Sequence, residues 1–131
     1  MHCDLLQILI VDDNPHMRTL ISEILRAIGV RHVFEAGDGA EALQIMRANP
    51  IDIVMTDLGM PRMDGRQVAQ EIKMASAATP VILLTGWGGI MQAEGTHPEH
   101  IDVVLGKPPQ VNELMAALHK VAQGGGAGRI H

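Results

Sequence analysis

Short apolar runs alternate with amphipathic segments along the chain, and this alternation constrains the fold more than any other feature. The apolar runs have the length of β-strands and cover about residues 5–11, 32–36, 51–56, 81–84 and 101–105. Between them, apolar residues recur at helical spacing, as in Met17, Ile21, Ile24 and Ile28. Strands without a polar face require helices on both sides of a parallel sheet. The pattern therefore predicts an α/β fold, a doubly wound (βα)5 sandwich around a five-stranded parallel sheet.

Local signals predict where several helices begin and end. Asn14 and Pro15 provide an N-cap and a proline at the first helical position. Gly29 is placed to end that helix in a left-handed conformation. Asp38 and Glu41 resemble a capping box at the start of the second helix, with Asp in the place of Ser or Thr.

The domain is expected to cover residues 1–123, followed by a flexible Gly-rich tail over 124–131. A length of 131 residues suits one domain. The segment 86–100 contains several glycines and a proline, so it is the weakest predicted helix, with about two turns around residues 90–94.

Composition excludes several classes of function. Hydrophobic residues make up 47% of the chain, and Phe34 and Trp87 are the only aromatic residues, so the core must be aliphatic. A net charge of −5 with interleaved acids and bases disfavours binding to nucleic acid or to an anionic membrane. Cys3 is the only cysteine, and no apolar run approaches the length of a signal peptide core or a membrane span. A cytoplasmic location is expected.

Polar residues follow four of the predicted strands at the point where each strand ends. Asp12 and Asp13 follow the first strand, Asp57 the third, Thr85 the fourth and Lys107 the fifth. Ligands of such sheets bind at the carboxyl ends of the strands, so these side chains should converge on one edge. A lone acid after a strand is usually a helix cap or a solvated turn; the combination is what indicates a site.

The expected cluster has a consistent charge balance. Three carboxylates repel one another, but a divalent cation and Lys107 together would neutralise them. A donor set of oxygen atoms favours a hard cation such as Mg²⁺. A carboxylate beside Mg²⁺ and a lysine is suited to attack phosphorus and form an acyl phosphate, with a hydroxyl donating to a phosphoryl oxygen.

Four motifs, in order and spacing, resemble the receiver (response regulator) domain of two-component signalling. They are residues 11–14 (Val-Asp-Asp-Asn), 57–65 (Asp-Leu-Gly-Met-Pro-Arg-Met-Asp-Gly), 84–86 (Leu-Thr-Gly) and 107–108 (Lys-Pro). The resemblance covers about residues 5–123. It implies the flavodoxin-like strand order 2-1-3-4-5.

The resemblance also implies roles for individual residues. Asp57 would accept a phosphoryl group from a histidine kinase or a histidine phosphotransfer protein. Mg²⁺ would be bound by Asp13, Asp57 and the backbone carbonyl of Gly59, with Asp12 acting mainly through water.

Two further residues complete the implied site. Thr85 would bind a phosphoryl oxygen, and Lys107 would pair with the acceptor carboxylate or the phosphate. The chain would be a signalling receiver that catalyses its own phosphotransfer and autodephosphorylation. It would act as a monomer or weak dimer without direct contact to nucleic acid or membrane.

Some positions depart from the family's pattern. Val104 stands where the family usually has Tyr or Phe as a switch residue, and Gly59 and Trp87 occupy the two variable positions beside the phosphoryl group. One hypothesis is that phosphorylation acts through the segment 86–95 instead of an aromatic switch. Whether the chain is a free-standing regulator or part of a hybrid kinase stays open.

Two alternatives use the same residues differently. A degenerate receiver would serve as a phosphorylation-independent interaction module, although all five site residues are present. A phosphatase of the haloacid dehalogenase type would need an aspartate two residues after its nucleophile. That position holds Gly59 after Asp57 and Asn14 after Asp12, so neither fits.

Overall fold

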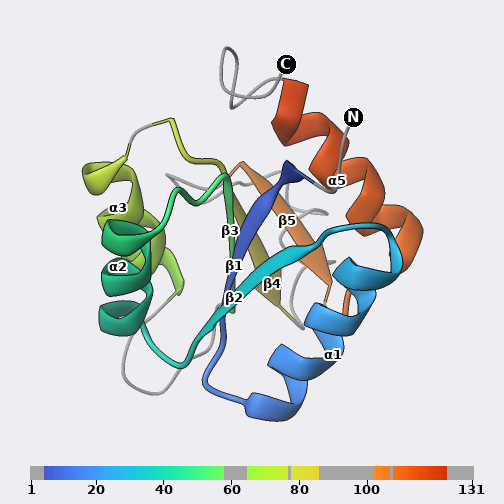
Figure 1. Ribbon diagram of the computed structural model, residues 1–131, viewed down its shortest axis with the longest axis horizontal. Helices are drawn as coiled ribbons and strands as arrows, with labels where there is room; N and C mark the ends of the chain where they lie inside the picture. The colour runs from blue at the N-terminus through green and yellow to red at the C-terminus, as the bar shows by residue number, and fades with distance from the viewer. Residues whose placement is uncertain (1–4, 58–64, 77, 86–101, 107, 124–131) are drawn as a thin grey trace.

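The computed structural model describes residues 5–57, 65–76, 78–85, 102–106 and 108–123. Strands and helices alternate along these residues (Figure 1). Their bounds are β1 (Gln7–Val11), α1 (Pro15–Ala27), β2 (His32–Ala36), α2 (Gly39–Ala48), β3 (Ile53–Asp57), α3 (Gly65–Ala75), β4 (Val81–Thr85), β5 (Val103–Gly106) and α5 (Val111–Gln123).

The five strands form one parallel sheet in the order β2-β1-β3-β4-β5. This confirms the predicted fold class and the flavodoxin-like order. The central strand β3 has all five residues buried, as expected of a strand covered on both faces.

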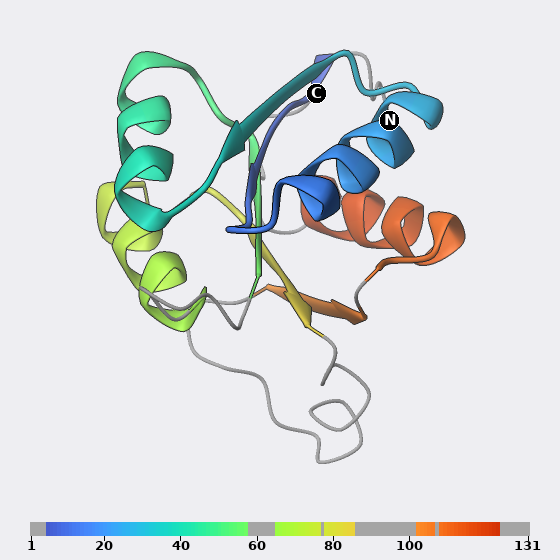
Figure 2. The same ribbon diagram turned by 90° about the horizontal axis from the view of Figure 1, so that it is seen from below.

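Helices cover both faces of the sheet. Figures 1 and 2 show α1 and α5 on one side and α2 and α3 on the other. Alternate residues of β1 supply the two layers: Ile8 and Ile10 pack in the cluster with α1 and α5. Leu9 and Val11 pack in the cluster with α2 and α3. The buried apolar residues in the described parts of the chain are all aliphatic, as predicted.

Helix-end signals were predicted well at α1. The Asn14 side chain accepts hydrogen bonds from the N–H groups of His16 and Met17, at 2.9 and 3.3 Å. At the other end Gly29 has φ 110°, and the N–H of Val30 bonds to the carbonyl of Leu25 at 3.0 Å. The N–H of Gly29 bonds to the Arg26 carbonyl at 3.1 Å. This is a Schellman cap that needs glycine.

The predicted capping box of α2 forms only in part. Asp38 accepts the N–H of Glu41 at 2.8 Å, as expected. The Glu41 carboxylate, however, accepts the N–H of Gly37 at 2.6 Å, one residue before the N-cap whose N–H a capping box would bind.

Two strands begin later than predicted, each directly after an aspartate that binds the neighbouring strand. The Asp52 carboxylate accepts the N–H of Gln7 at 2.9 Å, and β3 starts at the next residue rather than at Ile51. In the same way the Asp102 carboxylate accepts the N–H of Val81 at 2.8 Å, and β5 starts directly after it. At both points the backbone pairs as well: the N–H of Asp52 donates to the carbonyl of Gln7 at 2.8 Å, and the N–H of Asp102 to the carbonyl of Val81 at 2.9 Å. The first strand also starts later than predicted, at Gln7.

The buried face of α5 differs from the predicted one. Helical spacing in the sequence predicts that Val111 and Met115 share one apolar face with Leu114 and Leu118, but they are 48% and 46% exposed. The helix packs on the sheet with a neighbouring stripe instead, which consists of Leu114, Ala117, Leu118 and Val121. This stripe has the spacing i, i+3, i+4, i+7 of one helix face.

Two expectations about secondary structure fall outside the described residues: the weak helix within 86–100 and the Gly-rich tail over 124–131. Among the helices that the structure does describe, none is long and apolar enough to span a bilayer.

Candidate metal and phosphoryl site

Three carboxylates meet at one end of the sheet. One oxygen or more from each of Asp12, Asp13 and Asp57 lies within 4.8 Å of the others, an arrangement that can hold a metal ion. Asp12 is fully buried and Asp57 is 7% exposed, whereas Asp13 is exposed. Two carboxylates of the cluster are therefore buried, and the third lies at the surface.

The order of the strands brings these acids together. β1 and β3 are adjacent, and the last residue of β1, Val11, pairs with Thr56. The next residues, Asp12 and Asp57, therefore lie side by side although 45 positions separate them in sequence. Parallel strands end at the same edge, which is the reason that the sequence pattern could predict this meeting.

The turn between β1 and α1 holds the first acid in place. The N–H of Asn14 donates to Oδ1 of Asp12 at 2.8 Å. The N–H of Asp12 donates to the carbonyl of Ala36 on β2 at 3.0 Å. Asn14 therefore has two functions, because its own side chain also caps α1. The sequence predicted only the cap.

The backbone of β4 carries Thr85 to the same edge. Asp57 pairs with Leu84, so Thr85 is the next residue on the neighbouring strand. Thr85 itself pairs with Gly106, the residue before Lys107. The Thr85 side chain, Lys107 and Gly59 lie outside what the structure describes, so their predicted roles stay predictions.

The donor set of the cluster fits a hard divalent cation. All of its potential ligands are carboxylate oxygens, which suit Mg²⁺ better than a soft or nitrogen-preferring metal. Like charges this close repel one another, so a bound cation would relieve an unfavourable interaction. The geometry therefore supports the part of the predicted metal site that Asp12, Asp13 and Asp57 form.

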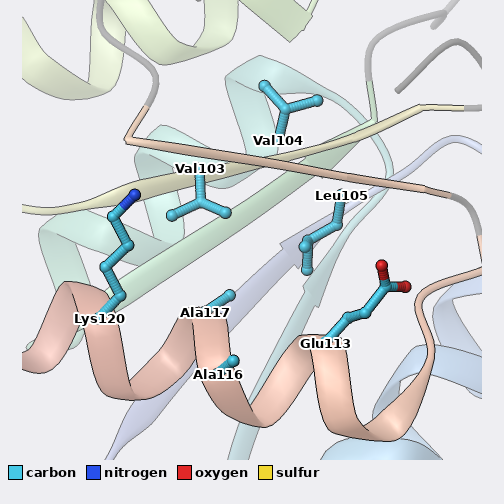
Figure 3. Close-up of a pocket in the computed structure, with 7 residues that line it drawn as sticks. All are labelled: Val103, Val104, Leu105, Glu113, Ala116, Ala117 and Lys120. Carbon is cyan, nitrogen blue, oxygen red and sulfur yellow. The ribbon is translucent and has the colours of Figure 1, made fainter. Parts of the chain in front are cut away.

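Val104 lies on the face of β5 that turns away from the groove between β5 and α5. Figure 3 shows Val103 and Leu105 pointing toward α5 and Val104 pointing to the opposite face. Val104 is 3% exposed and packs in the cluster with α2 and α3. Valine is a short side chain with restricted χ1, so it can make no large inward swing of the kind expected of an aromatic ring. The segment 86–95, proposed as the alternative route, lies outside the described residues.

Two residues beside the acids, Arg18 and Glu35, were not predicted from the sequence. Arg18 of α1 donates from Nη1 to the backbone carbonyl of Asp12 at 2.6 Å. Its Nε lies 3.3 Å from Oε1 of Glu35 on β2. No local sequence pattern indicates this contact. In the sequence, Arg18 and Glu35 look like charged surface residues of a helix and of an edge strand.

Comparison with known proteins agrees with this geometry. The family model of the response regulator receiver domain matches residues 8–119. The sensor histidine kinase RcsC of Salmonella typhi is 32% identical over 120 residues, which are 92% of this chain and 13% of that protein. The chain thus spans about an eighth of the length of this curated relative.

Solved structures extend the similarity to three dimensions. A response regulator receiver domain protein from Clostridium thermocellum matches with a TM-score of 0.78 at 32% identity, covering 89% of this chain and 94% of that one. The response regulator TrrA of Thermotoga maritima, in complex with Mg²⁺-BeF, matches with a TM-score of 0.77 at 30% identity. That match covers 89% of this chain and 99% of the other.

Proposed function

The chain belongs to the response regulator receiver domain family, and we propose that it acts in a two-component phosphorelay by accepting a phosphoryl group on Asp57. The donor would be a phosphohistidine on a histidine kinase or a histidine phosphotransfer protein. The similarity to a sensor histidine kinase supports this class of partner.

One observation carries the proposal. Asp57 ends the central strand and is 7% exposed, and its carboxylate lies beside those of Asp12 and Asp13. Burying a carboxylate against two others is unfavourable unless an opposite charge compensates for it. A cation bound beside Asp57 would supply that charge, and it would also attract a phosphoryl group to Asp57.

The three acids would also hold the metal ion. We assign Mg²⁺ to Asp12, Asp13 and Asp57, with the carbonyl of Gly59 as a further proposed ligand. When bound, Mg²⁺ neutralises charge on the carboxylates and on the phosphoryl oxygens. The relative TrrA, whose structure was solved with Mg²⁺-BeF, supports the choice of metal.

The transfer takes place at the Asp57 carboxylate. A carboxylate oxygen of Asp57 attacks phosphorus and forms a P–O bond, while the P–N bond to the donor histidine breaks and the imidazole leaves with the electron pair. Thr85 would donate its hydroxyl to one phosphoryl oxygen, and Lys107 would place its ammonium beside another. Attack by water on phosphorus would later release phosphate and restore the Asp57 carboxylate.

The remaining properties follow from this function. We propose a cytoplasmic domain, monomeric or weakly dimeric, that exchanges phosphoryl groups with a protein partner and contacts neither nucleic acid nor membrane directly. The domain would cover residues 1–123, with 124–131 as a tail.

Acetyl phosphate and intact-mass measurement test the proposal. With Mg²⁺ the parent protein should gain one phosphate, and Asp57→Asn should gain none. Asp38→Asn is a matched control, because Asn caps a helix as well as Asp does and Asp38 is not one of the three clustered acids. Continued labelling of the Asp57→Asn protein would show that the acceptor is another residue.

A further inference from the structure

Arg18 reaches back from the first turn of α1 to the strand end that carries the acids. Its Nη1 donates to the carbonyl of Asp12 at 2.6 Å, a short bond from a charged donor. Its Nε lies 3.3 Å from Oε1 of Glu35. The Arg18 side chain is 22% exposed and that of Glu35 is 41% exposed. Arg18 thus connects α1, the β1–α1 turn and the edge strand β2.

The contact falls on the backbone carbonyl of Asp12. The N–H of Asp12 is already bonded to the carbonyl of Ala36, and its side chain accepts the N–H of Asn14. The Asp12 carbonyl belongs to the peptide group that joins Asp12 to Asp13. Because a peptide group is planar, fixing this carbonyl also fixes the direction of the following N–H and the position of the Asp13 Cα.

Asp13 is the acid whose position depends most on a fixed backbone. Asp12 and Asp57 are buried in the sheet edge, whereas Asp13 is exposed on the turn. A side chain on a turn can occupy several positions, and only some of them bring its carboxylate within reach of the other two. Restricting the backbone before it reduces the entropy lost when a metal ion binds.

We propose that Arg18, held by Glu35, is a positioning residue for the metal site, because it fixes the Asp12–Asp13 peptide and so places the Asp13 carboxylate. This inference rests on the proposed function, since it assumes that Asp13 binds Mg²⁺. Arg18 contacts the backbone carbonyl of Asp12 and the carboxylate of Glu35, so it would act on the metal site through the backbone. Groups of this kind, one contact removed from a metal ligand, typically change metal affinity about 10- to 100-fold when mutated.

The sign of the effect separates positioning from simple electrostatics. A guanidinium beside a cation site repels the cation, so a purely electrostatic role predicts that removing Arg18 tightens Mg²⁺ binding. A positioning role predicts the opposite, because Asp13 loses its fixed backbone. A role in stability alone predicts a lower melting temperature with unchanged Mg²⁺ affinity.

Calorimetric titration of the full chain with Mg²⁺, together with melting in EDTA, tests these possibilities. Arg18→Met should weaken Mg²⁺ binding about tenfold or more. Arg18→Lys should weaken it as well, because a single ammonium keeps the charge but lacks the planar fork that contacts both acceptors. Arg26→Met, which removes the same charge from the exposed far end of α1, should leave the affinity close to that of the parent.

A second pair of variants tests the proposal without changing Arg18. Glu35→Gln and Glu35→Ala remove the same charge, but only Gln keeps an oxygen that can accept from Arg18. Glu35→Ala should therefore bind Mg²⁺ more weakly than Glu35→Gln. This pair of variants also tests the positioning role of Arg18 if Arg18→Met fails to fold.

The outcomes distinguish this inference from the function on which it rests. If the parent does not bind Mg²⁺, or if Asp13→Ala binds it equally well, the proposed metal site is wrong and the inference falls with it. If the parent binds Mg²⁺ through Asp13 but Arg18→Met and Arg18→Lys bind as tightly or more tightly, only the role of Arg18 is overturned.

Discussion

The buried carboxylate of Asp12 lies within 4.8 Å of the carboxylate of Asp57 on the adjacent strand. The register of β1 on β3 fixes this proximity, because Val11 pairs with Thr56. Neither side chain can move far, since each follows directly from a buried strand. The crowding of acids is therefore a property of the sheet, and the turn that carries Asp13 is the part of the cluster that can adjust.

Mg²⁺ should stabilise the folded protein. A ligand at ten times its dissociation constant that binds only the native state adds about 1.4 kcal/mol to the free energy of unfolding, which corresponds to a few degrees in melting temperature. Thermal melts at increasing Mg²⁺ concentration measure this shift. Asp13→Ala should lose most of it, and an unchanged response in that variant would place the metal site elsewhere.

The same acids should destabilise the protein when no metal is present. Asp13→Asn removes one of three clustered negative charges at an exposed position, where solvent screens the repulsion. We expect a gain of about 0.5–1 kcal/mol in the free energy of unfolding in EDTA. Urea denaturation measures it, with Asp38→Asn as the control for replacing an Asp outside the cluster. A loss of stability in Asp13→Asn would mean that its charge is favourable without metal.

Gly29 should be sensitive to replacement for a reason of backbone conformation. Its φ of 110° lies in the region that side chains disfavour, so Gly29→Ala should cost about 1–2 kcal/mol of folding free energy. Gly106→Ala is the control, because a Cβ added there meets no atom within 4 Å and its φ is not positive. Chemical denaturation of both variants should show a clear difference, and equal stabilities would contradict the importance of the left-handed cap.

Replacing Asp102 should lower the free energy of unfolding more than replacing its ion-pair partner Lys73 does. Its Oδ2 accepts from Nζ of Lys73 at 2.9 Å and from the N–H of Val81 at 2.8 Å. Lys73→Met removes a partly exposed ion pair worth about 0–1 kcal/mol. Asp102→Ala also leaves the N–H of the buried Val81 without this acceptor, so it should cost about 1–3 kcal/mol. Denaturant midpoints measure both losses, and a larger loss in Lys73→Met would reverse this ranking.

The layers of the fold and the edge at which the acids meet were predictable from local sequence patterns. Apolar runs and helical periodicity depend on residues only a few positions apart, so they are visible without any knowledge of long-range contacts. Asn14 and Gly29 were predictable for the same reason, because caps act within one helical turn. The lateral order of the strands was not local information, and it was predicted only through resemblance to a known family.

The tertiary structure decided the contacts that join distant parts of the chain. The Asp52 and Asp102 side chains bind backbone groups of the neighbouring strands just before β3 and β5 begin. Val111 and Met115 lie outside the core because α5 packs with a different stripe. Arg18 meets Glu35 because β2 pairs with β1, so that the edge strand lies beside the turn from β1 to α1. Such contacts depend on which elements become neighbours in space, and side-chain types along the sequence carry little information about that choice.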